Sequence, residues 1–166
     1  LAVTSLACIG NTIISISLDG TISASNIETK KAEKILTGIN NPFCITANEK
    51  ANTFYIGTLD GRVCLVNSSK KEVMKEERFL TSEAVSVSIH SISNSGCVLS
   101  NTEVVLFNLD SLEVKKRLRI TADCCNCVTF STDGLSLLIT TTEGTVRVVD
   151  TVSFVEVGCQ QFDIGE

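Results

Sequence analysis

The densest group of potentially reactive side chains in this 166-residue chain is Cys124-Cys125-Asn126-Cys127. Thiolates at this spacing can share a metal ion or form a redox pair. Zinc sites usually take four ligands from paired cysteine groups or histidines, and this chain has one histidine and no second cysteine cluster. We therefore expect no metal site here. A redox switch at Cys124 and Cys125, or a small-molecule site that includes Cys127, stays open as the alternative.

The remaining cysteines have the surroundings of packing residues. Cys44, Cys64 and Cys97 each lie inside a short apolar run, where a thiol behaves as a small buried hydrophobe. We therefore interpret the eight cysteines as reduced thiols in a reducing compartment and expect a cytoplasmic protein.

The sequence gives little support to catalysis or to a cofactor. His90 lies in the strand-like run Ser88-Ile89-His90-Ser91, and no Gly-x-Ser-x-Gly elbow accompanies it. No glycine-rich phosphate loop of the Gly-x4-Gly-Lys-Ser/Thr type is present. We expect a non-enzymatic protein without a cofactor, in which His90 is a structural, hydrogen-bonded side chain.

Charge and hydropathy exclude two further classes of partner. The chain carries 14 Lys+Arg and 19 Asp+Glu, a net charge of −5, so its overall field does not favour nucleic acid or anionic lipid. Apolar stretches such as Leu137-Leu138-Ile139 are far shorter than the roughly 18 residues of a membrane span. We expect neither a nucleic-acid partner nor a membrane partner.

A repeat organises the whole sequence. Four segments end alike at Asn26, Asn67, Asn108 and Asp150, with spacings of 41, 41 and 42 residues. In each segment a short turn pair interrupts two strand-forming runs, and the Asp-Gly form of the pair suits a two-residue hairpin. The turn pairs are Asp19-Gly20, Asp60-Gly61, Asn101-Thr102 and Glu143-Gly144.

Two further β-rich runs flank each hairpin, so each repeat contains four predicted strands. The fourth run is the most polar and carries lysines at 41-residue spacing, typical of a protected outer edge strand. Residues 69–83 prefer helix by composition, but the repeat predicts a strand there. The first runs are 3–9, 43–47, 85–89 and 125–130; the fourth runs are 32–37, 72–79, 113–120 and 155–162.

The repeat resembles the WD-repeat family, whose blades are four-stranded sheets of about 40 residues. The best match runs from Ile35-Leu36-Thr37-Gly38 through Asp60-Gly61 to Val66-Asn67. Ile39 stands where the family has histidine, and the chain has no tryptophan, so the family's hydrogen-bond network is incomplete. Ser25, Val66, Phe107 and Val149 occupy the tryptophan positions. We still expect Asp19 and Asp60 to bind turn amides.

The resemblance implies an all-β propeller of four-stranded antiparallel blades. Residues 1–166 would form part of one propeller, with blades at about 1–37, 38–80, 81–121 and 122–166. The repeats resemble those of family members that form rings of seven or eight blades. We therefore expect this chain, which begins without methionine, to be part of a larger ring. Because an open stack leaves apolar faces bare, further sequence or a second copy would complete it.

The resemblance also implies a function in protein–protein interaction. Within the family, the runs at 13–22 and 55–64 are similar to a branch that acts with cofilin in actin filament disassembly. A cytoskeletal scaffold that binds actin or cofilin is therefore expected, with the scaffold of another complex as the alternative. Loops held by a rigid framework concentrate recognition, and blade topology should bring five residues to one end of the channel. They are Asn40, Asn41, Asp60, Arg62 and Glu143.

Overall fold

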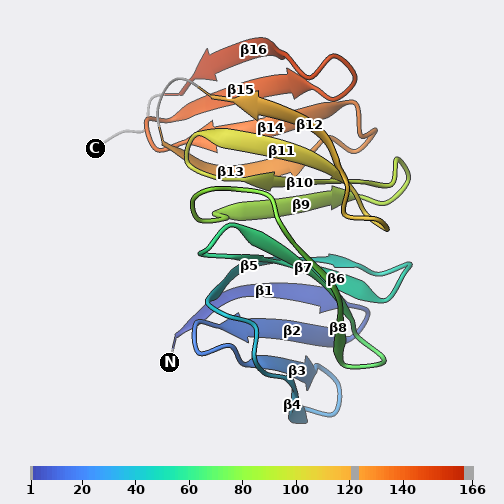
Figure 1. The fold of residues 1–166 in the computed structure, drawn as a ribbon. Helices are drawn as coiled ribbons and strands as arrows, with labels where there is room; N and C mark the ends of the chain where they lie inside the picture. The colour runs from blue at the N-terminus through green and yellow to red at the C-terminus, as the bar shows by residue number, and fades with distance from the viewer. Residues whose placement is uncertain (1, 121–123, 163–166) are drawn as a thin grey trace. The chain divides into compact units, whose positions relative to one another are not determined.

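The computed structural model describes residues 2–120 and 124–162, which form strands and no helix (Figure 1). Four antiparallel sheets follow one another along the chain, each built from four consecutive strands in sequence order. Their strands are β1 (Val3–Ile9), β2 (Thr12–Ser17), β3 (Ile22–Asn26) and β4 (Ala32–Leu36); β5 (Pro42–Asn48), β6 (Thr53–Thr58), β7 (Arg62–Asn67) and β8 (Glu72–Arg78); β9 (Ser86–His90), β10 (Ser95–Leu99), β11 (Glu103–Asn108) and β12 (Val114–Arg119); β13 (Cys125–Phe130), β14 (Ser136–Thr141), β15 (Thr145–Asp150) and β16 (Glu156–Gln161).

The chain divides into two compact units. Residues 1–84 hold the first two sheets and residues 85–166 the last two. In the first unit β1 lies beside β5, and the Thr4 hydroxyl donates to the carbonyl of Pro42 at 3.1 Å. In the second unit β9 lies beside β13, where the amides of Val128 and Phe130 donate to the hydroxyls of Ser86 and Ser88. The first strands of two successive sheets are thus neighbours in each unit.

The turn between the third and fourth strands recurs in all four sheets. The side chain at the end of each third strand accepts backbone N–H bonds from the turn, as in Asn67 with Lys70 at 2.8 Å. The residue four positions later has a left-handed backbone, although it is never glycine. These residues are Lys30, Lys71, Leu112 and Phe154, with φ between 55° and 59°. The repeat inferred from sequence therefore exists in the backbone.

The strand β8 resolves the conflict between helix propensity and repeat. All seven of its side chains are exposed, and composition alone favours helix there. Pairing with β7 from Asn67↔Glu72 to Arg62↔Arg78 nevertheless holds the segment extended. The predicted strand is confirmed, because a ladder of backbone hydrogen bonds outweighs a small per-residue propensity.

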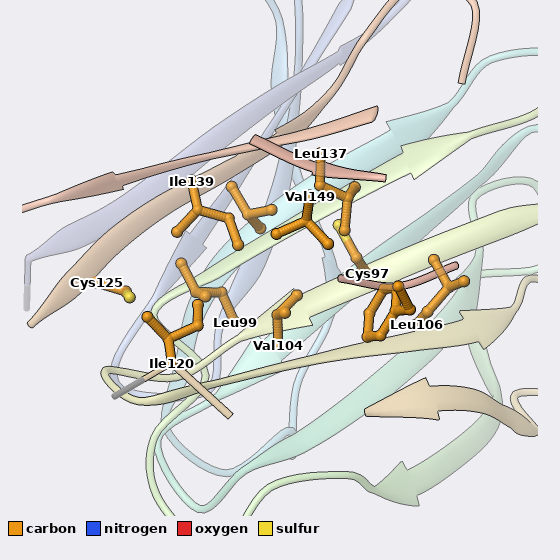
Figure 2. Close-up of a cluster of buried hydrophobic side chains, with 11 residues drawn as sticks. Cys97, Leu99, Val104, Leu106, Ile120, Cys125, Leu137, Ile139 and Val149 are labelled. Atoms are coloured by element: carbon orange, nitrogen blue, oxygen red, sulfur yellow. The ribbon is translucent and has the colours of Figure 1, made fainter. Parts of the chain in front are cut away.

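Each unit has its own hydrophobic core between its two sheets. In the first unit Ile14, Ile16 and Ile22 meet Phe54 and Ile56, all fully buried. In the second unit the core gathers inward-facing side chains from β10, β11, β14 and β15 (Figure 2). Its members are Cys97, Leu99, Val104, Leu106, Ile120, Cys125, Val128, Leu137, Ile139, Val149 and Phe154.

Burial along the second strands differs between sheets. Every residue of β6 and β10 is buried. In β14, by contrast, buried residues alternate with half-exposed ones such as Leu138. Leu138, Val146 and Val148 together line an open hollow on that sheet face. The face is thus apolar without being fully covered.

Candidate partner-binding site at the β6–β7 turn

The turn between β6 and β7 is a tight hairpin in which Gly61 has a positive φ of 83°. The Gly61 amide donates to the Thr58 carbonyl at 3.0 Å. The Gly61 carbonyl accepts from the amides of Phe79 and Leu80, both at 3.0 Å, where the chain leaves β8. A Cβ at Gly61 would collide with the carbonyl oxygens of Leu80 and Ser82. Glycine is therefore required both by conformation and by space.

A buried hydroxyl fixes the side chains of this turn. Thr58 is 1% exposed, and its hydroxyl donates to a carboxylate oxygen of Asp60 at 2.5 Å. The Thr58 hydroxyl oxygen in turn accepts from the Arg62 amide at 3.1 Å. Sequence reasoning missed Thr58, although the residues preceding the four turns share a hydroxyl. These residues, Ser17, Thr58, Ser100 and Thr141, recur at spacings of 41, 42 and 41.

Asp60, Arg62 and Glu76 form a half-exposed ion triad. The Arg62 Nε atom lies 2.8 Å from Asp60, and its Nη1 atom lies 2.8 Å from Glu76 on β8. The Thr58 hydrogen bond, reinforced by Arg62, lowers the pKa of Asp60 below its ordinary value. Both carboxylates raise the pKa of Arg62 further. Glu76 was also missed from sequence, since only strand register brings β8 next to Arg62.

Asn40 and Asn41 lie beside this triad turn in the link that leads into β5. Both side chains are exposed, and the Asn41 carbonyl accepts from the Leu59 amide at 3.0 Å. Asn41 has a φ of 46°, which asparagine adopts more readily than most residues. The structure thus brings Asn41 to the hairpin that carries Asp60 and Arg62.

Glu143 lies in the other compact unit, at the equivalent turn between β14 and β15. Its side chain is exposed, and its carbonyl accepts from the Gln161 amide group at 2.6 Å. The neighbouring turn is fixed by paired hydroxyls of Thr141 and Thr145, 2.6 Å apart. Glu143 therefore occupies the position of Asp60 in its own turn, but Thr145 stands there in place of Arg62.

The two predicted turn aspartates behave differently. Asp19 accepts from the Thr21 amide at 2.9 Å, as expected, and this bonding lowers its pKa. At Asp60 the carboxylate accepts from the Thr58 hydroxyl and the Arg62 guanidinium, where Asp19 accepts from the amide two residues later. The amide of Arg62, which stands at the position of Thr21, donates to the Thr58 hydroxyl instead.

The cysteine cluster does not converge on one point. Cys125 is 1% exposed and belongs to the core shown in Figure 2, while Cys124 and Cys127 are exposed. The Cys127 sulfur lies 3.8 Å from the Ser86 hydroxyl. As expected, Cys44, Cys64 and Cys97 are buried, and burial raises the pKa of Cys64 to about 12. Over residues 2–120 and 124–162, no three His, Cys, Asp or Glu side chains gather as a metal site.

His90 is a hydrogen-bonded, partly exposed side chain, as expected. Its Nδ1 lies 2.8 Å from the Ser93 hydroxyl and its Nε2 lies 3.3 Å from the Thr132 carbonyl. The ring packs against Phe130, with ring centroids 5.9 Å apart, and a Cβ at Gly134 would overlap it. Both nitrogens and one ring face are therefore engaged in structure.

Comparison with known proteins leaves the site to be judged on its geometry. The chain matches no protein-family model, and no curated protein is significantly similar to it.

Proposed function

We propose that this chain is a non-catalytic protein–protein interaction scaffold, built as four blades of a WD-type β-propeller. The support is the fourfold recurrence of one sheet with one set of turn hydrogen bonds, and the packing of successive sheets within each unit. In this proposal the ring has seven or eight blades. Further sequence or a second copy covers the open apolar face at Leu138, Val146 and Val148.

The observation that carries the scaffold proposal is the dense hydrogen bonding of the β6–β7 turn. Asp60 and Arg62 carry half-exposed charges on this hairpin. Its backbone is hydrogen-bonded to Phe79 and Leu80, directly after β8, and to Asn41. Pre-positioned charged groups lose little freedom on binding, so they favour recognition by a protein with complementary charge. Asn40 and Glu143 complete the proposed contact set.

For the partner, we propose actin or cofilin, in a function like that of actin-interacting protein 1 in filament disassembly. The support is the similarity of residues 13–22 and 55–64 to the second propeller of that protein. This proposal places the chain in the cytoplasm, in association with the cytoskeleton.

A cosedimentation experiment with actin filaments and cofilin tests both parts of the proposal. The variant Asn41→Gly, Asp60→Ala, Arg62→Ala should lose binding while its circular dichroism and urea unfolding show an intact fold. The control Lys50→Ala changes an exposed residue of the β5–β6 turn and should bind normally. Unchanged binding by the triple variant would remove the turn from the interface. Failure of the unmodified chain to cosediment would remove actin and leave another partner for the scaffold.

Light scattering tests the ring. An open half-ring should either associate or bind a hydrophobic dye through its uncovered face. A monomer without dye-binding surface would contradict the half-ring.

A further inference from the structure

The outer side of β16 is an open sheet edge. β16 is the last strand of its sheet, and among residues 124–162 no strand pairs with its outer side. The Phe162 amide bonds to the Gly144 carbonyl at 2.9 Å, and the register continues through Thr145↔Gln161 and Arg147↔Cys159. Antiparallel residues alternate between bonding to the neighbour and pointing away. The N–H and C=O groups of Cys159 and Gln161 therefore point away from β15.

The other three fourth strands carry a charge at the position of Cys159. Strand register places Lys34, Glu76 and Arg117 opposite the equivalent third-strand residues Ser23, Cys64 and Val105. The position of Gln161 is taken by Arg78 in β8 and by Arg119 in β12. Charges at edge positions discourage the addition of a strand from another chain. Among the outer strands of the four sheets, β16 is the one whose residues at both positions, Cys159 and Gln161, are uncharged.

Charged partners on the adjacent third strand hold two of these side chains. Glu76 is held by Arg62 at 2.8 Å, and Arg117 is held by Glu103 at 3.1 Å. In the last sheet Thr145 stands at the position of Arg62 and Glu103, and Arg147, opposite Cys159, binds Glu156 at the beginning of β16 with contacts of 2.9 and 3.1 Å. The pair neutralises the one acidic residue of the strand and leaves residues 157–162 without charge.

We propose that this edge docks the β16 strand of a second copy, antiparallel across a two-fold axis. An isologous contact brings each residue of the edge against the same edge of the partner copy, so an edge with charges of one sign would repel itself. The run from Gly158 to Phe162 meets its own copy with no charges opposed, whereas the uniformly cationic β12 would oppose lysines and arginines. The exposed Phe162, at 48%, gains cover from the contact.

The two-fold axis through Gln160 gives the register. Each Cys159 then pairs with Gln161 of the second copy, because these residues present the outward N–H and C=O groups. The two sheets become one continuous eight-stranded sheet through backbone bonds, the mode of strand addition seen in peptide recognition.

Concentration-dependent mass and amide exchange of the complete chain test this proposal. The mass should double with rising concentration, and the amides of Cys159 and Gln161 should exchange more slowly in the associated state. Gln161→Lys places like charges across the axis and should raise the dissociation constant by at least about tenfold. Val152→Lys adds the same charge at an exposed residue of the β15–β16 turn and should leave association unchanged.

Two results would overturn the edge contact, and one of them separates it from the ring proposal. A monomer at all concentrations, with unprotected Cys159 and Gln161 amides, rejects association through β16. Association that survives Gln161→Lys but is lost in Leu138→Ser places the contact on the open sheet face instead. That second outcome rejects the edge contact and supports completion of a ring by a second copy.

Discussion

At the scale of single residues, the β6–β7 turn shows how a degenerate repeat retains a defined local structure. The chain lacks the histidine and tryptophan of the resembled family, yet the Thr58 hydroxyl links the Asp60 carboxylate to the Arg62 amide. The ion pairs beside it are half exposed, and such pairs contribute only about 0–1 kcal/mol each to folding. The buried hydroxyl, more than the charges, holds the turn.

Replacement of that hydroxyl should therefore cost more than replacement of a carboxylate. Thr58→Val leaves the Arg62 amide without its acceptor and should lower the free energy of unfolding by about 1–3 kcal/mol. Asp60→Asn keeps a hydrogen-bond acceptor and should lower it by under about 1 kcal/mol. Urea unfolding at neutral pH measures both. Equal losses in the two variants would show that charge, rather than the buried hydroxyl, organises the turn.

The turn aspartates also set the response of the fold to acid. The pKa values of Asp19, Asp60, Asp133 and Asp150 are lowered in the folded state, chiefly by hydrogen bonds from Thr21, Thr58, Ser131 and Ser153. Their stabilisation is complete above the ordinary aspartate pKa and is lost as the pH falls through the lowered folded values. The urea midpoint should therefore be flat near pH 6 and fall as the pH drops below about 4. A midpoint unchanged over that range would contradict the assigned bonding.

At the scale of elements, glycines in the links between strands are required to different degrees. Gly61 and Gly38 both have positive φ, but a Cβ at Gly61 meets two carbonyl oxygens, whereas a Cβ at Gly38 meets nothing within 4 Å. Substitutions at these two glycines therefore distinguish the cost of a steric collision from the cost of backbone strain.

Alanine at each position should show that separation. Gly38→Ala adds only the left-handed strain, so it should lower the free energy of unfolding by about 1–2 kcal/mol. Gly61→Ala adds a collision with Leu80 and Ser82 and should cost clearly more. Chemical unfolding of the two variants, compared with the unmodified chain, decides the point. Similar losses would mean that the Leu80–Ser82 link moves freely.

The sequence predicted the elements better than the site. The period of about 41 residues located the strands to within a residue or two, because turn residues and apolar runs recur with it. The repeat also predicted the strand β8 correctly, although the composition of that segment favours helix. The site was incomplete, because Glu76 reaches Arg62 through strand register, and register depends on bulges such as that between Leu65 and Val66. No local pattern encodes that bulge.

At the scale of the whole molecule, stability resides in two separate cores. Each core lies between two sheets of one compact unit, so each sheet contributes one apolar face to it.

Truncation of a core leucine should show this dependence on inter-sheet packing. Leu137 is fully buried against the preceding sheet, and Leu137→Ala should lower the free energy of unfolding by about 2–5 kcal/mol. Leu135 is 55% exposed two residues earlier, and Leu135→Ala should change it by no more than about 0.5 kcal/mol. Differential scanning calorimetry of both variants makes the comparison. A mild effect at Leu137 would indicate loose packing between the sheets.

The left-handed residues between third and fourth strands have a consequence for the order of folding. Lys30, Lys71, Leu112 and Phe154 adopt a conformation that costs such residues roughly 1–2 kcal/mol, so these turns form poorly in isolation. The hairpins at Asp19-Gly20 and Asp60-Gly61 have glycine at the positive φ and form readily. Fourth strands should therefore dock last, after the rest of each sheet has assembled. Substitutions in β8 should then accelerate unfolding while leaving the refolding rate nearly unaltered.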